Sequence, residues 1–302
     1  MGKTTGMLPR PAIVLAIASV FATGFVASLA GSSDHAAAGG GTVTLVRVVD
    51  TWDWHRPSPD PSGISRIGNT SRFAVVDGEV DETHLWQGAN VWFTRRSLSP
   101  LEAWSSRRFS SEPTDVAMPT RRLIFLSDDG HKRVFRVRAG RDGDFGTSDD
   151  EKTFFSTRPF GSRDPEGLAF GRGMLFVADG DATQVFRVDP GRDGRFGGGV
   201  DNDDRVTSFD TRRLGLDEPE GIAYFAGDLF LVSRDNDVIV RTTLDGGVIA
   251  TYDISSSRIK NPSGIAVLRD NASLMAYVTD RGVDNSVQPN ENDGMIFVLS
   301  LD

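Results

Sequence analysis

The side chains best suited to chemistry in this chain are carboxylates that recur at fixed places in a repeated phrase. Glu166 and Glu220 each stand between a proline and a glycine, and Asp115 lies one position further along its own copy of the phrase. Carboxylates that cluster repel one another unless a cation neutralises them, and oxygen ligands are those that Ca²⁺ prefers. Because glutamate is a poor turn former, we expect these residues to hold a Ca²⁺ ion at the mouth of a channel.

A second group of acids follows a short apolar run in each copy of the repeat. Such runs are typical of strands, so the acids directly after them lie in loops at strand ends. We expect these loops to form an acidic surface that binds a ligand; the alternative is a row of turn-forming aspartates, each capping its own loop. The acids of this group are Asp77, Glu79, Asp128, Asp179, Asp235 and Asp280, with Asp129 beside them.

A glycine-rich loop carries a third pattern of oxygen side chains. Asp142, Asp144, Ser148 and Asp150 recur at even spacing among glycines, which is how short loops wrap Ca²⁺. The pattern is not an EF-hand, because the glycine placement differs and strands rather than helices are expected on both sides. A second copy of the loop has Arg195 where the first has Asp144. We predict a structural Ca²⁺ ion in the first copy; the alternative is a long hairpin with aspartate turns.

Two histidines could serve as a general base near a channel ion. His131 and His84 both fall in loops after second strands of the repeat, and a histidine beside a metal ion can activate water for hydrolysis. The alternative is that both are solvated loop residues. The sequence has no Gly-x-Ser-x-Gly elbow, no P-loop and no dinucleotide fingerprint, which disfavours serine hydrolases and nucleotide-binding enzymes.

A fivefold repeat sets the elements that must position these residues. Each copy continues with further β-branched and aromatic runs. The spacing between the copies, whose first residues are given below, fits a four-stranded propeller blade. We therefore predict an all-β, five-bladed β-propeller, with six blades as the alternative. The copies begin at Pro61, Pro113, Pro165, Pro219 and Pro262.

The two ends of the repeat array predict how the ring closes. The last copy stops after its third strand, and an apolar run at 42–49 precedes the first copy. Since a linear array would leave open sheet edges, we predict that the 42–49 strand completes the last blade from outside. Strands of a blade alternate in direction, so Glu166, Glu220 and the loops after second strands share one face, called the top face. The Asp142 loop lies on the opposite, bottom face.

The N-terminus is typical of a signal peptide. Lys3 and Arg10 precede a nearly unbroken run of apolar and small residues at 12–30. We expect a signal peptide over 1–30, a linker over 31–41 and the propeller over 42–302. This arrangement predicts a secreted, extracellular protein; an uncleaved N-terminal anchor is the alternative. The chain has no cysteine, so disulfides cannot restrain its loops.

The net charge of −9 limits the kinds of molecule that this protein is expected to bind. It disfavours nucleic acid and anionic membrane surfaces and suits cations. Apart from the N-terminal run, no segment is apolar enough to span a membrane. We expect a monomer that binds an unidentified small molecule or protein.

The phrase Pro-Glu-Gly-Ile/Leu-Ala, followed by Leu-Phe-Val-Ala-Asp, resembles the NHL-type and SdiA-regulated propeller families. Over 42–302 the chain is also similar to secreted bacterial proteins described as having esterase-like activity of phytase. It is more distantly similar to the senescence-marker-protein/gluconolactonase and paraoxonase group. In that lactonase-like group Ca²⁺ lies in the central channel on Glu, Asp and Asn side chains, so the resemblance implies Glu166 and Glu220 as ligands.

The sequence departs from the lactonase-like pattern in the other copies of the phrase. Ser62, Thr114 and Ser263 fill the slots that Glu166 and Glu220 fill in theirs. We therefore expect an exported calcium-binding propeller that binds a ligand or protein partner on its acidic top face. The alternative is a Ca²⁺-dependent hydrolase of the lactonase, esterase or phytase kind.

Overall fold

The computed structural model describes residues 1–2, 39–197, 203–283 and 293–302. All described strands belong to one unit, which the chain forms from residue 37 onward. The predicted signal peptide, apart from Met1 and Gly2, and most of the predicted linker lie outside the described residues. Within the described ranges, no helix combines the length and the apolar character needed to cross a membrane.

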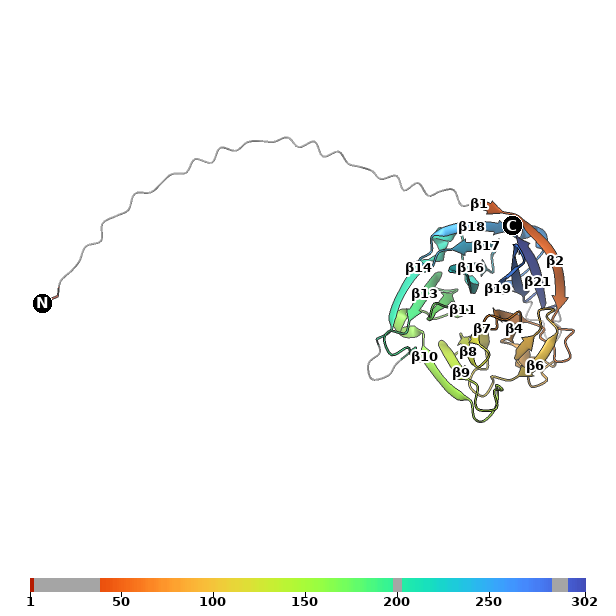
Figure 1. The fold of residues 1–302 in the computed structure, drawn as a ribbon, viewed down its shortest axis with the longest axis horizontal. Helices are drawn as coiled ribbons and strands as arrows, with labels where there is room; N and C mark the ends of the chain where they lie inside the picture. The colour runs from red at the N-terminus through yellow and green to blue at the C-terminus, as the bar shows by residue number, and fades with distance from the viewer. Residues whose placement is uncertain (3–38, 198–202, 284–292) are drawn as a thin grey trace, which may run out of the picture. The chain divides into compact units, whose positions relative to one another are not determined.

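The strands form five sheets around a common centre, with the first strand of each sheet innermost (Figure 1). Blade 1 contains β3 (Pro61–Arg66), β4 (Phe73–Asp77), β5 (Val91–Thr94) and β6 (Pro100–Trp104). Blade 2 contains β7 (Pro113–Thr120), β8 (Leu123–Asp128), β9 (Arg133–Arg138) and β10 (Glu151–Ser156). Blade 3 contains β11 (Pro165–Gly171), β12 (Met174–Asp179), β13 (Gln184–Asp189) and β14 (Arg205–Asp210).

Blades 4 and 5 complete the ring. Blade 4 contains β15 (Pro219–Phe225), β16 (Asp228–Ser233), β17 (Asn236–Thr242) and β18 (Val248–Asp253). Blade 5 contains β19 (Pro262–Asp270), β20 (Ser273–Asp280), β21 (Met295–Leu301) and β2 (Val43–Asp50). The short 3₁₀ helices η1 (Val80–Glu82), η2 (Arg158–Phe160), η3 (Thr211–Leu214) and η4 (Ser255–Ser257) lie between strands. Each inner strand contacts the next around the ring, and β19 contacts β3, so the predicted five-bladed propeller is confirmed rather than the six-bladed alternative.

The N-terminal strand closes the ring as predicted. β2 pairs antiparallel with β21 and thereby forms the outer strand of blade 5. One additional strand was not predicted: β1 (Gly39–Gly41) pairs parallel with β18 and extends blade 4. The start of the propeller therefore crosses the joint between blades 4 and 5, next to the C-terminus, where Thr42 and Asp302 exchange backbone hydrogen bonds (Figure 1).

The joints between blades hold the hydrophobic core. A separate buried cluster fills each joint, and each cluster draws side chains from two neighbouring sheets. Phe230 and Tyr252 of blade 4, for example, pack with Ile265 and Phe297 of blade 5. Successive side chains of a strand point to opposite faces of its sheet, and each face packs against an adjacent blade. The apolar runs of the sequence therefore supply both faces of every sheet.

The glycine of the repeated phrase is required by the close approach of the inner strands. A Cβ atom on Gly221 would lie 2.7 Å from the Cα atom of Gly264, and one on Gly264 would lie 2.8 Å from the Cα atom of Gly63. No side chain fits between backbones at these distances. The inner strands therefore approach one another closely at the axis.

Candidate metal centre at the channel mouth

Small hydroxyl side chains clasp neighbouring blades at the channel mouth, the end of the axis where the inner strands begin. The Oγ atom of Ser263 donates to the carbonyl of Pro61 at 2.7 Å, and the Oγ atom of Ser62 donates to that of Pro113 at 2.8 Å. The Oγ1 atom of Thr114 donates to the carbonyl of Pro165 at 2.7 Å. These hydrogen bonds give the slot before the glycine a structural role in three blades.

Blades 3 and 4 place carboxylates in this slot instead. Glu166 and Glu220 are both buried, and neither can donate a hydrogen bond to the next blade when ionised. Each missing hydroxyl hydrogen bond between blades lowers the stability of the fold by about 1 kcal/mol, and burying a carboxylate adds a desolvation cost. The fold gains nothing from either change, so the two glutamates point to a function of the channel mouth.

Three carboxylates converge near the start of blade 3. An oxygen of Glu166 lies within 4.8 Å of oxygens from Asp129, in the β8–β9 loop, and Asp164, directly before β11. The Oδ1 atom of Asp129 is buried and has no hydrogen-bond partner among the described residues. Gly180 leaves space beside this cluster, since a Cβ atom there would lie 2.9 Å from an oxygen of Asp164. The three carboxylates of the Asp129–Asp164–Glu166 cluster lie close enough together to hold a cation.

A small cavity of about 50 Å³ opens beside this cluster. Its size suits one ion with one or two waters, because a water molecule occupies about 30 Å³ in the liquid. The cavity is far too small for an organic substrate. The residues that line it are Asp60, Ser62, Gly78, Glu79, Glu112, Thr114, Asp129, Glu166 and Arg281.

Cationic side chains already neutralise part of the carboxylate charge. Arg281, directly after β20, lies 3.7 Å from Glu166 and has only 14% of its side-chain surface exposed. Arg234 pairs with Glu220 at 2.7 Å, and Lys132 lies 3.8 Å from Asp164. Glu220 is thereby held by arginines, while Glu166 joins the Asp129–Asp164–Glu166 cluster. The predicted pair of calcium ligands therefore divides into two different environments.

Burial shifts three carboxyl groups at the mouth toward their protonated forms. Burial and then the charge of Glu220 raise the pKa of Glu166 to about 8, against the opposing effect of Arg281. Burial also raises the pKa of Glu220, although Arg281 and Arg234 oppose the rise. The pKa of Asp164 is raised by burial and by the charge of Asp181. A divalent cation would favour the ionised form of each group.

The raised pKa of Glu166 predicts how stability depends on pH in calcium-free buffer. Between about 4.5 and 8 the folded state holds this proton more tightly than the unfolded state does, so the free energy of unfolding falls as the pH rises. Glu166→Gln should flatten this dependence and stabilise the metal-free protein above pH 8, by at most about 5 kcal/mol. Urea unfolding at a series of pH values measures the effect. Glu151→Gln, at an exposed carboxylate, is the control and should keep the wild-type slope; an unchanged slope in Glu166→Gln would contradict the prediction.

Four of the acids that we expected to bind a ligand instead anchor loops. Asp77, Asp128, Asp179 and Asp280 end their second strands fully or almost fully buried. Asp179 accepts hydrogen bonds from backbone amides of two loops, from Arg163 at 2.8 Å and from Ala182 at 2.7 Å. Equivalent bonds reach Asp77 and Asp280, while Asp128 accepts from the amide of His131 and from the hydroxyl of Ser110. This geometry is the turn-capping alternative, repeated from blade to blade.

The other two predicted ligand-binding acids lie on the surface. Asp235 is exposed, and the pairing of Pro219 with Ser233 shows that Ser233, not Asp235, occupies the anchoring position in blade 4. Glu79 is exposed between β4 and η1 and lines the small cavity. Of the six, Glu79 is the one whose position fits contact with a ligand over the channel mouth.

Asp115 takes the place of the glycine in the repeated phrase. Its Oδ2 atom accepts from the amide of Leu168 at 2.8 Å and its Oδ1 atom from that of Val116 at 2.7 Å. The amide of Ile64 also donates to it, so the carboxylate joins blades 1, 2 and 3. Burial raises the pKa of Asp115 well above its ordinary value. These contacts give Asp115 a structural role, and its prediction as a calcium ligand has no geometric support.

The two histidines lie outside the small cavity's lining. His131 has its Nδ1 atom 2.9 Å from Asp128, and its ring packs edge-on against Phe135 of the third strand. His84 is exposed in the loop after η1. Neither arrangement places an imidazole beside the Asp129–Asp164–Glu166 cluster.

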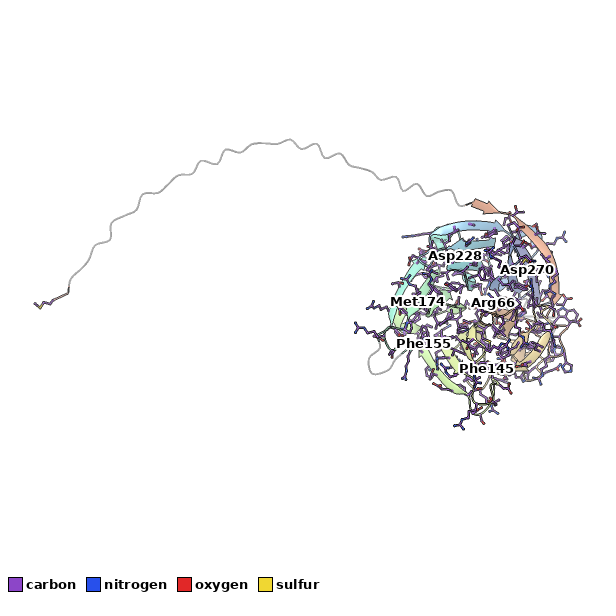
Figure 2. The ribbon with its side chains drawn as sticks, viewed as in Figure 1. Arg66, Phe145, Phe155, Met174, Asp228 and Asp270 are labelled. Carbon is purple, nitrogen blue, oxygen red and sulfur yellow. The ribbon has the colours of Figure 1, made fainter. Side chains whose placement is uncertain are left out.

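The bottom-face loop satisfies its aspartates with its own amides. Asp142 accepts from the amide of Asp144 at 3.0 Å, and Asp150 accepts from that of Gly146 at 2.8 Å. Ser148 is exposed. Phe145 at the loop's centre stacks on Trp104 of blade 1 at 5.7 Å and thereby ties blade 2 to blade 1 (Figure 2). The hairpin alternative accounts for these contacts, and Ca²⁺ in this loop stays a prediction.

Comparison with known proteins supports the architecture. No protein-family model matches the chain, and no curated protein sequence matches it. The structure of a glutaminyl cyclase from Myxococcus xanthus matches with a TM-score of 0.57 and 13% identity, over 88% of this chain and 98% of that one. The structure of a calcium-binding protein, regucalcin, from Agrobacterium tumefaciens matches with a TM-score of 0.51 and 14% identity, over 87% and 96%. At these identities the likeness shows the β-propeller fold alone.

Proposed function

We propose that this protein is an exported calcium-binding β-propeller that binds its ligand or protein partner over the acidic channel mouth. The observation that carries the proposal is the convergence of Asp129, Asp164 and Glu166 on one point beside a cavity of ionic size. The buried, unpartnered Oδ1 atom of Asp129 supports it, because a buried carboxylate oxygen is costly unless something occupies it.

The chemistry of the donors favours Ca²⁺ among the common cations. The cluster offers only oxygen atoms, and the described residues place neither cysteine nor histidine in it, so it suits a hard ion rather than Zn²⁺. An all-carboxylate cluster beside a small cavity suits the flexible coordination of Ca²⁺ better than the strict octahedron of Mg²⁺. Arg281 would remain the counter-charge of Glu220 while the ion takes over Glu166.

Weak binding of Ca²⁺ at this site is consistent with the proposed export of the protein. A site with three carboxylates and neighbouring cations should bind weakly, and extracellular calcium modules work at dissociation constants of about 10⁻⁴ to 10⁻³ M. The regucalcin structure is that of a calcium-binding protein, which agrees with the proposal although the likeness shows only the fold. Membership of the NHL-type or SdiA-regulated-like secreted propellers is the finer part of the same proposal.

The calcium site predicts a specific response to mutation. Saturating Ca²⁺ should raise the melting temperature of the wild-type propeller relative to EDTA, since a ligand at about a hundredfold excess over its Kd adds about 2.7 kcal/mol. Asp129→Asn/Glu166→Gln should abolish this shift, because it removes two of the three charged ligands. Calorimetric titration with CaCl₂ and thermal melting measure the effect.

The bottom-face loop supplies the matched control. Asp142→Asn/Asp144→Asn removes the same number of charges from the other predicted calcium site. If this variant loses the calcium response and the channel variant keeps it, the ion lies in the loop and the proposal fails. A wild-type protein whose melting temperature is the same in Ca²⁺ and in EDTA would exclude both sites.

We propose binding rather than hydrolysis. A Ca²⁺-dependent hydrolase needs a base near the ion, and His131 instead contacts Asp128 and Phe135. The raised pKa of Glu166 would suit proton transfer, but the small cavity leaves no room for an organic substrate beside that carboxyl.

A further inference from the structure

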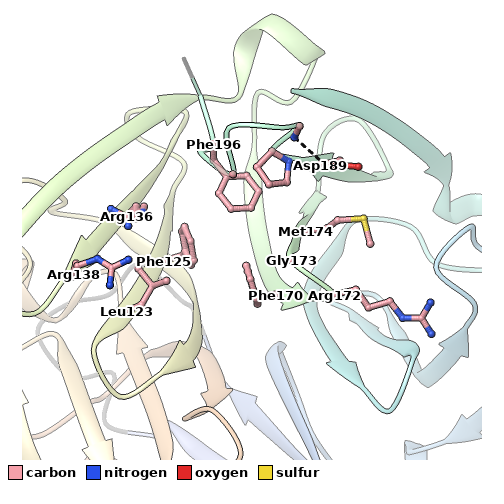
Figure 3. Close-up of a pocket in the computed structure, with 13 residues that line it drawn as sticks. Leu123, Phe125, Arg136, Arg138, Phe170, Arg172, Gly173, Met174, Asp189 and Phe196 are labelled. Carbon is pink, nitrogen blue, oxygen red and sulfur yellow. Dashed lines mark hydrogen bonds between the residues drawn. The ribbon is translucent and has the colours of Figure 1, made fainter. Parts of the chain in front are cut away.

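A groove lies between blades 2 and 3 at the bottom face, away from the channel mouth (Figure 3). Its volume is about 740 Å³, which is within the range of sites for small organic ligands, about 300–1,000 Å³. The ends of β8, β9, β11 and β12 supply most of its walls. The small cavity at the channel mouth shares no lining residue with it.

The floor of the groove is aromatic. Phe125 stacks on Phe170 at 5.8 Å with an angle of 10° between the rings, and Phe196 meets Phe125 edge-on at 5.5 Å. Phe170 and Phe196 are only half-buried, and Leu123 lies beside them (Figure 3). Such a surface favours a planar apolar group, which can lie against the ring faces and edges.

Arginines line the groove in a protein whose net charge is −9. Arg136 and Arg138 stand on one side of the groove (Figure 3), where they share the exposed Glu151 at 3.5 and 3.9 Å. Arg172 lies on the other side, but its guanidinium points away from them, and a Cβ atom on Gly227 of blade 4 would lie 3.4 Å from its Nη2 atom. The two arginines that face the groove therefore exceed the one carboxylate that they share.

The one other acid of the groove is already occupied. Asp189 accepts a hydrogen bond from the amide of Gly191 at 3.1 Å (dashed line in Figure 3). An adjoining hollow of about 640 Å³ continues the groove and adds Lys152, Arg195 and the ring of Phe154. The surplus of positive charge thus extends along the joint between the blades.

The neighbouring joints between blades show that the half-buried aromatic floor and the surplus of positive charge do not follow from the repeat. Phe145 is the counterpart of Phe196 at the joint between blades 1 and 2, where it is buried against the larger Trp104. In blade 3 the counterpart of Arg136 is Arg187, which pairs with Asp245 at 2.7 Å. Phe196 stacks in the same way on Phe155 at 6.1 Å but stays half-buried, and Arg136 shares its one carboxylate, Glu151, with Arg138. The joint between blades 2 and 3 is therefore more open than the joint between blades 1 and 2, and its arginines are less fully neutralised than Arg187.

We propose that this groove binds a small organic anion, with a planar apolar body on Phe170 and Phe196, which the buried Phe125 supports from below, and a carboxylate or phosphate held by Arg136 and Arg138. Arginine forms paired, charge-assisted hydrogen bonds with both kinds of anion. The proposal is independent of the calcium site, because the two share no residue.

Calorimetric titration of the full propeller with 1-naphthyl phosphate and with 1-naphthoate tests the groove. We expect saturable one-to-one binding of at least one anion, and much weaker binding of neutral 1-naphthol. Arg136→Gln/Arg138→Gln should weaken binding at least about tenfold, the effect of losing one charge-assisted hydrogen bond. Arg187→Gln, the matched change in the next blade, should stay within about twofold. The ratio of the two anion affinities identifies phosphate or carboxylate as the preferred group.

Three results would overturn the proposal: no saturation by either anion, binding of 1-naphthol as tight as that of the anions, or the same affinity in the double arginine variant as in Arg187→Gln. Melting temperatures of all variants show whether a loss of binding reflects unfolding. Asp129→Asn/Glu166→Gln, which alters only the channel mouth, should bind the anion as the wild type does.

Discussion

Arg281→Met is expected to lower the free energy of unfolding by about 3–5 kcal/mol in calcium-free buffer near pH 8, the range found when one partner of a buried ion pair is removed. Burial alone would lower the pKa of Arg281, but the carboxylates of Asp60, Glu166, Glu220 and Glu79 together raise it. Without the guanidinium, Glu166 and Glu220 would face each other with less counter-charge. The loss should grow as the pH rises, because protonated carboxyl groups need no cation.

Two further variants make this expectation specific. Arg234→Met removes the arginine that pairs with Glu220 from a half-exposed position, and it should cost no more than about 1 kcal/mol because solvent screens that pair. Arg281→Met/Glu166→Gln/Glu220→Gln should recover most of the loss. Urea unfolding at pH 5 and pH 8 measures all three. A cost for Arg281→Met that equals the cost for Arg234→Met would show that the buried charge is not what Arg281 neutralises.

Calcium should partly rescue the Arg281→Met variant. The guanidinium pairs with Glu166 and the proposed ion would bind the same carboxylate, so removing the guanidinium should increase the stabilisation that the ion provides. We expect the stabilisation by Ca²⁺ to be larger in Arg281→Met than in the wild type. An equal response would indicate that the ion, if bound, does not contact Glu166.

Asp179→Ala is expected to destabilise the propeller by about 3–5 kcal/mol, because it leaves several partly or fully buried amides without an acceptor. The carboxylate accepts from Arg163 at 2.8 Å, Asp164 at 2.9 Å and Ala182 at 2.7 Å. One of these amides belongs to a proposed calcium ligand, so the affinity for Ca²⁺ should fall as well. Denaturant unfolding and calcium titration below the transition measure the two effects.

The surface aspartate of blade 4 is the matched control. Asp235→Ala changes an exposed residue that we had grouped with Asp179 from the sequence, and its effect should stay within about 0.5 kcal/mol. Equal costs for the two substitutions would contradict the anchoring role. A large stability loss in Asp179→Ala without any loss of calcium affinity would show that Asp164 is positioned by other contacts.

The loop aspartates show why the sequence pattern alone could not assign a structural or a metal-binding role to each of them. An aspartate after a strand reads the same whether its oxygens face backbone amides, as those of Asp179 do, or a cavity, as that of Asp129 does. The difference depends on the side-chain direction and on loops from other parts of the chain. Arg281 has no distinguishing signal in the sequence for a related reason: it directly follows the anchoring Asp280 at the start of a loop in which the acids are the more conspicuous residues.

The sequence by itself determined the architecture. The repeat, its strand patterns and the unassigned 42–49 run predicted five blades and ring closure, because these follow from local periodicity and from the need to cover open sheet edges. The unusual glutamates were also visible, since Glu166 and Glu220 replace the hydroxyl residues of other copies. Only the tertiary structure decided that Glu166 joins Asp129 and Asp164 and lies beside Arg281, while Arg234 pairs with Glu220. Those groupings depend on register and on contacts between blades, which no single repeat encodes.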